Sequence, residues 1–194
     1  MVIRRSKRIR ALAATHGWLW RKHDESVVGA FIGYPFGIGR GERADDVMRG
    51  PFQGRQVLLF DLGFRTGSGD DERTWWIGVY CVTDLPRALP VLEVVRRGWT
   101  RPGPSRGIGS RYQTGDRDFD RHYRVTTQSQ ASAAAVLSPA FISYLQAGPA
   151  FDWRIEGTRM LTWGPGPMRP KRVEGMLSQL VALASAIPQE AWRR

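Results

Sequence analysis

The stretch FDRHYRV, residues 119–125, places an acid and a histidine where they could transfer protons. Asp120 and His122 are two positions apart, so both side chains would point to one face of a β-strand. A carboxylate next to an imidazole can act as a general acid and base. The same alternation also describes the solvated outer face of an amphipathic strand, and the sequence favours this interpretation. Arg121 would then interrupt the inner face and, if buried, would need an acidic partner.

Other motifs with chemical potential lack the spacing that their chemistry requires. The three histidines and the single cysteine do not form a zinc-ligand pattern, and Cys81 lies inside an apolar run typical of a buried side chain. The glycine-rich stretches 37–41 and 103–110 miss the further residues of a nucleotide-binding loop. No serine occupies a Gly-x-Ser-x-Gly turn. We therefore expect no cofactor and no metal.

The densest charge in the chain lies between residues 4 and 22, which include seven basic residues and no acid. The whole chain has a formal net charge of +11. Such a segment can contact phosphates of nucleic acid or an anionic membrane surface, and nearby tryptophans suit either partner. Alternatively, the arginine excess is a compositional bias spread over the surface. The residues expected to bind an anion are Arg4, Arg5, Lys7, Arg8 and Arg10.

The pattern along the chain predicts one domain over residues 1–194, with four parts. A basic N-terminal helix occupies residues 1–22, and a strand-rich half follows over residues 23–97. Proline, glycine, serine and arginine dominate residues 98–117, which we expect to form a loop. Residues 118–194 are expected to form a strand, helices, a hairpin and a final helix.

Three local patterns support this organisation. The dipeptide QG between residues 45–52 and 55–67 predicts a hairpin. Residues 151–163 predict a second hairpin, and apolar residues at helical spacing predict a last helix that begins at Pro170 and ends before Pro188. Strands grouped in the sequence, with helices gathered later, favour an α+β fold. We expect an antiparallel sheet with helices packed mainly on one face.

Several landmarks, taken in order, resemble a group of uncharacterised actinobacterial proteins that share a domain of unknown function. They are GPFQGRQVLLFDLGF (50–64), LPRALPVLEV (85–94), FDRHYRVTTQSQASAAAVLSPAFISYL (119–145) and WRIEGTRMLTW (153–163). Some members of that group carry membrane-spanning segments before the domain, where this chain has its basic segment. The resemblance implies no catalytic residues, because none are established for the group.

These observations favour a non-enzymatic binding or scaffold domain that docks on nucleic acid or an anionic membrane surface through its basic helix. A small enzyme with a cleft near Asp120 and His122 is one alternative. A subunit of an obligate oligomer, in which tryptophans meet a protein partner or a second copy, is another. The single cysteine and the absence of a run of roughly 18 apolar residues predict a cytoplasmic protein, at most peripheral to the membrane.

Overall fold

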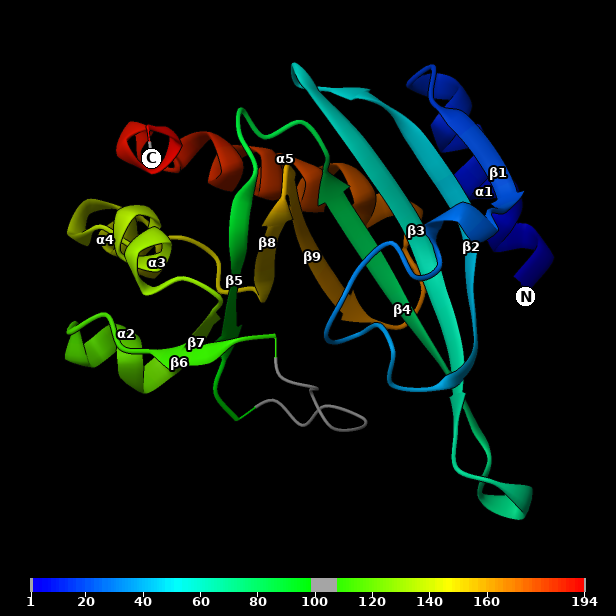
Figure 1. Cartoon of the computed structure of the whole chain (residues 1–194). Coiled ribbons are helices and arrows are strands. Elements are labelled where there is room, and N and C mark those ends of the chain that lie inside the picture. The colour runs from blue at the N-terminus through cyan, green and yellow to red at the C-terminus, as the bar shows by residue number, and fades with distance from the viewer. Residues whose placement is uncertain (1, 99–107, 194) are drawn as a thin grey trace.

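The computed structural model describes residues 2–98 and 108–193, and their strands form a continuous antiparallel sheet of nine strands (Figure 1). The order across the sheet is β1-β2-β3-β4-β9-β8-β5-β7-β6. The α+β class and the antiparallel sheet expected from the sequence are confirmed. The strands are β1 (Leu19–His23), β2 (Arg40–Phe52), β3 (Arg55–Thr66), β4 (Arg73–Val82), β5 (Leu89–Arg96), β6 (Ser110–Tyr112), β7 (Tyr123–Thr127), β8 (Trp153–Gly157) and β9 (Arg159–Pro165).

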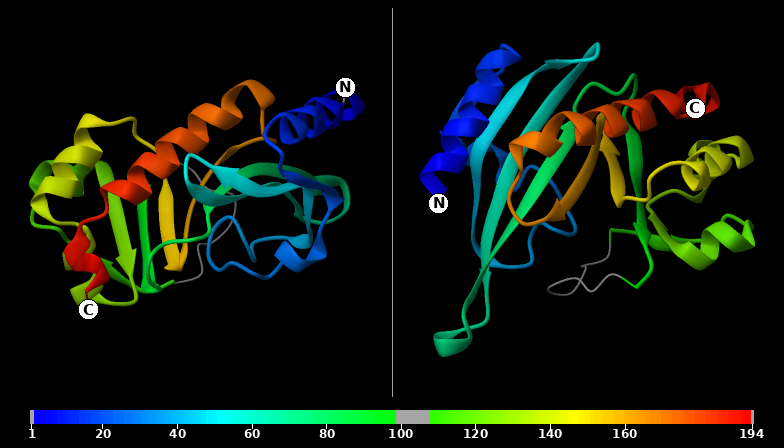
Figure 2. Two further views of the ribbon diagram at one scale, coloured as in Figure 1. Left: turned by 90° about the horizontal axis from the view of Figure 1, so that it is seen from above. Right: turned by 180° about the vertical axis from the view of Figure 1, so that it is seen from behind.

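The long α-helices lie over one face of this sheet, where α1 and α5 are neighbours (Figure 2). Buried side chains of α1, α3, α4 and α5 belong to one hydrophobic cluster together with strand residues of that face. The other face is covered by the irregular segment 24–39, which contributes buried aromatic residues to a second cluster. The helices are α1 (Val2–Thr15), α2 (Arg117–His122), α3 (Gln130–Val136), α4 (Pro139–Ala147) and α5 (Pro170–Ala186).

Strand β3 shows how one sequence serves both faces. Val57 and Leu59 face the helices, whereas Leu58 and Phe60 face the second cluster. Because successive side chains of a strand alternate, a strand covered on both sides is apolar nearly throughout. Asp61 occupies the next position on the helix side of this alternation and is fully buried.

The predicted hairpins are present. Strands β2 and β3 pair in register up to Phe52 and Arg55, and Gln53 and Gly54 both have positive φ, as a two-residue turn of this kind requires. Strands β8 and β9 form the second hairpin. Helix α5 begins at Pro170, as expected.

Three local predictions were wrong. The helix expected over residues 1–22 ends at Thr15, and Leu19–His23 form strand β1. Residues 119–122 belong to helix α2, because Asp116 caps its N-terminus by accepting a hydrogen bond from the Phe119 amide at 2.9 Å; the strand β7 begins only at Tyr123. Within the segment expected to be a loop, residues 110–112 form strand β6, which pairs with β7. The remainder of that predicted loop lies partly outside the described residues.

Candidate anion-binding surface

Helix α1 packs on the sheet through a narrow apolar stripe and presents its cations on the remaining surface. Ile9 and Ala13 are buried in the main cluster, four residues apart as helical periodicity requires. Lys7, Arg8 and Arg10 are exposed. The helix stops where Gly17 adopts a φ of +67°, a conformation that glycine adopts without strain.

Arg5 does not join those exposed cations, contrary to the sequence-based expectation. Its guanidinium donates to the carboxylate of Asp61 at 2.5 Å and to that of Asp46 at 3.0 Å. Both carboxylates are buried. Arg5 therefore neutralises buried acid beneath α1 and is not available to a partner. Arg4 belongs to α1, but its side chain lies outside the described set.

The buried carboxylates are held by further donors. Asp46 also accepts hydrogen bonds from the Ser6 hydroxyl at 2.6 Å and the Trp20 indole at 3.3 Å. Asp61 accepts one from the Met168 amide at 2.6 Å. Burial nevertheless raises the pKa of Asp61 to about 6, since the loss of hydration outweighs the hydrogen bonds and the nearby guanidinium. This cluster fixes α1 to β2 and β3.

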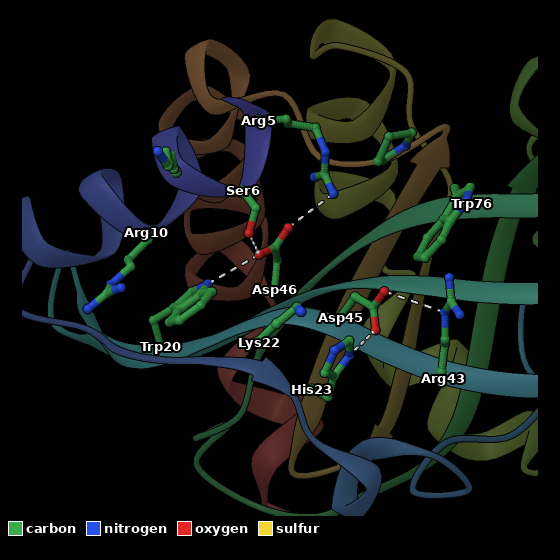
Figure 3. Close-up of a pocket in the computed structure, with 12 residues that line it drawn as sticks. Arg5, Ser6, Arg10, Trp20, Lys22, His23, Arg43, Asp45, Asp46 and Trp76 are labelled. Atoms are coloured by element: carbon green, nitrogen blue, oxygen red, sulfur yellow. Dashed lines mark hydrogen bonds and ion pairs between the residues drawn. The ribbon is translucent and has the colours of Figure 1, made fainter. Parts of the chain in front are cut away.

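Beside this cluster, α1, β1 and β2 enclose a groove of about 490 Å³ (Figure 3). Three of the cations that line it, Lys7, Arg10 and Lys22, have no ion pair with any carboxylate in the described part of the chain. The carboxylates in its wall are already engaged: Asp46 as above, and Asp45 by His23 at 2.7 Å. The other lining residues are Arg5, Ser6, Arg43, Trp76, Trp20 and Pro167.

The two tryptophans of the groove are occupied by the protein itself. The guanidinium of Arg10 lies 5.4 Å from the Trp20 ring centre, and that of Arg43 lies 4.7 Å from the Trp76 ring centre. Such cation–π contacts hold the arginine heads over the groove. The indole rings therefore hold these two arginine side chains in place, and one face of each ring is not open for base stacking.

A second group of cations was missed by the sequence analysis. Arg169, Lys171 and Arg172 are exposed around the start of α5 and, with Arg8 of α1, line a separate pocket. The signal in the sequence was the short run MRPKR at residues 168–172, far from the basic N-terminal segment. Only the packing of α1 against α5 brings the two segments together.

The proposed acid–base pair has a structural role instead. Asp120 accepts hydrogen bonds from the backbone and hydroxyl of Thr114, at 3.2 and 3.1 Å, and from the Gly115 amide at 3.2 Å, so both its oxygens hold the preceding loop. His122 is exposed and interacts with the Asp118 carbonyl at 2.9 Å. Arg121 is exposed and needs no buried partner. Helical geometry separates the two side chains that a strand would have aligned.

No protein-family model and no curated protein matches this chain. Among solved structures, the crystal structure of the mycobacterial trehalose monomycolate transport factor A, TtfA, is similar, with a TM-score of 0.64 and 13% sequence identity. The match covers 93% of this chain and 90% of that one. At this identity the likeness establishes the fold alone.

Two further properties concern the described residues only. They contain no helix that combines the length and the apolar character needed to span a membrane. They also contain no cluster of three or more histidine, cysteine or acidic side chains placed to hold a metal ion.

Proposed function

We propose that this chain is a non-enzymatic binding domain that docks on an anionic partner through the groove beside α1. The observation that carries the proposal is the grouping of Lys7, Arg10 and Lys22 around one groove without acidic partners. Like charges held close together repel one another, and an anion that enters the groove relieves this repulsion.

Of the anionic partners open to the sequence, a membrane surface has more support than nucleic acid. Proteins that bind single strands stack bases on free aromatic rings, but Trp20 and Trp76 are each covered by an arginine on one face. A membrane surface requires only clustered cations. A protein of the same fold is a transport factor for trehalose monomycolate, so a role near lipids is compatible with this architecture. We further propose that the protein is cytoplasmic and peripheral to the membrane, and that it is related to the actinobacterial group that it resembles.

The test compares two triple variants of equal charge change. The groove variant is Lys7→Gln, Arg10→Gln and Lys22→Gln, and the control is Arg117→Gln, Arg121→Gln and Arg124→Gln, which removes three exposed cations around α2 and β7. Sedimentation with phosphatidylserine-containing vesicles measures binding, and a labelled single-stranded DNA provides the second probe.

We expect the unmodified chain to bind the vesicles and to lose binding as salt rises, because exposed charges are screened over about 8 Å at physiological ionic strength. The groove variant should bind at least about tenfold more weakly, as removal of three surface charge contacts implies. Equal binding by both triple variants, to vesicles and to DNA, would refute the docking role. If the groove variant lost binding to DNA but not to vesicles, the partner would be nucleic acid.

A further inference from the structure

The pocket on the opposite side of α1 differs in character from the groove. Arg8, Arg169, Lys171 and Arg172 surround a hollow of about 510 Å³, and no carboxylate is among the described residues that line it. None of these four cations is paired with an acid of the described chain. Helix α5 also begins there with no acidic residue in its first turn and no side-chain cap. Four unpaired cations in one concavity favour an anionic ligand, and guanidinium groups pair well with a phosphate.

This cationic pocket shares two residues with a second cavity. Arg169 and Arg172 also line a neighbouring cavity of about 320 Å³, whose other lining residues include Tyr80, Met176 and Arg96. Tyr80 is 5% exposed, and its hydroxyl makes no hydrogen bond with another described residue. Burial raises the pKa of Tyr80 to about 12, so the hydroxyl keeps its proton and can donate to an anionic ligand.

The apolar path extends further along α5. Phe151 lines the cavity just described and also a third one of about 330 Å³, formed with Leu145, Tyr144 and Leu183. Among the α5 residues that border the three cavities, Arg172, Met176, Gln179 and Leu183 are spaced by four, three and four positions and so share one helix face. The eleven residue-to-residue steps from Arg172 to Leu183, each with a rise of about 1.5 Å, make this track about 16.5 Å long. Figure 2 shows α5 running from beside α1 toward α4.

We propose that the three cavities form one site for an anionic amphiphile with a phosphate head group. The head lies among Arg8, Arg169, Lys171 and Arg172, and the hydrocarbon chain lies along α5 past Met176 and Phe151. Such a ligand matches both halves of the track, whereas free phosphate leaves the apolar part empty and a polynucleotide leaves it unused. The inference goes beyond the docking role, because a single molecule is held on the α5 side of α1.

The test is a calorimetric titration of the full chain with dodecyl phosphate below its micelle concentration, and with inorganic phosphate. We expect dodecyl phosphate to bind at least about tenfold more tightly, since burial of each methylene contributes ~0.8 kcal/mol. Arg169→Gln with Arg172→Gln should weaken dodecyl phosphate binding by about tenfold or more, whereas the charge-matched Arg121→Gln with Arg124→Gln should leave it unchanged. Far-UV circular dichroism checks that each variant is folded.

A second variant tests the apolar part of the site without changing any arginine. Phe151→Ser with Met176→Gln changes two partly exposed side chains and should weaken binding of dodecyl phosphate without changing that of inorganic phosphate. Equal affinity for the two ligands, or equal loss in the α5 and control variants, would overturn the site. The groove variant of Lys7, Arg10 and Lys22 should still bind dodecyl phosphate, so failure of this site and failure of the docking role are distinguishable.

Discussion

Replacement of Arg5 by glutamine should destabilise the protein far more than removal of a neighbouring cation. The substitution leaves Asp61, which is fully buried, and Asp46 without their shared guanidinium. Loss of one partner from a buried ion pair costs about 3–5 kcal/mol. We expect about 3 kcal/mol, at the lower end, because the Arg5 side chain retains 23% exposure and glutamine keeps a hydrogen-bond donor. The control is Lys7→Gln, which removes an exposed cation of the same helix that contacts no buried acid among the described residues.

The pH dependence of this loss gives a second, independent readout. The folded-state pKa of Asp61, about 6, lies above its ordinary value of 3.8, so the stability associated with its proton is present below pH 3.8 and is lost as pH rises through 6. A difference of about two pKa units corresponds to ~3 kcal/mol. In Arg5→Gln the pKa rises further, because an attractive charge is removed. The variant's deficit relative to the unmodified chain should therefore be larger at pH 8 than at pH 5.

Urea denaturation of both variants and the unmodified chain at pH 5 and pH 8 measures these free energies of unfolding. If Arg5→Gln destabilises the protein no more than Lys7→Gln does at pH 8, Arg5 does not stabilise the buried carboxylates. If the deficit of Arg5→Gln is the same at both pH values, Asp61 does not carry the unpaired charge.

Three other outcomes follow from buried groups. Arg154→Met should lower the free energy of unfolding by about 3–5 kcal/mol, because Glu93 and Glu156 would remain buried without the guanidinium that contacts both. An unchanged midpoint of urea denaturation would contradict this. Burial raises the pKa of the Cys81 thiol to about 12, so maleimide at pH 8 should label it only as the chain unfolds. Rapid labelling of the folded protein would contradict this, because it would show that the thiolate is accessible. Hydrogen bonds from the Ser26 hydroxyl and from Arg49 lower the pKa of Asp24 to about 2. The unmodified chain should therefore be more stable than Asp24→Asn above pH 4, and this difference should disappear as the pH falls to 2. A difference that stays constant with pH would contradict this role of Asp24.

The periodicities of the sequence were sufficient to predict the elements that bury a face, but not every pairing between them. The hairpin between β2 and β3, helix α1 and helix α5 follow from turn residues and apolar spacing. Helix α2 was misread as a strand, because an alternation over only seven residues also fits a short helix, and its N-cap lies outside the stretch that shows the alternation. The pocket between Arg8 and Arg169 could not be predicted, because it depends on the packing of α1 against α5.

The role of Arg5, in contrast, has a signal in the sequence. Arg5, Ile9 and Ala13 are four residues apart, so the arginine lies on the apolar stripe of its helix. Asp61 similarly lies on the inner face of its strand, two positions after Leu59. A cation within one apolar stripe and an acid within another imply a buried pair, since either charge alone would be too costly to bury. The sequence-based assignment of Arg5 to the binding surface was wrong because it used the charge of Arg5 and not its position on the apolar stripe.

The phase of α1 also explains how a single helix serves two cationic hollows. Arg5 turns inward to Asp61, Lys7 and Arg10 border the groove beside β1, and Arg8 borders the pocket beside α5. Because residues advance by 100° along a helix, the inward pair determines the direction of every other cation on α1. A disturbance of the Arg5–Asp61 contact would thus displace both hollows together, whereas substitution of an exposed cation alters one of them. The buried pair is in this sense part of the binding surface, although no anion would touch it.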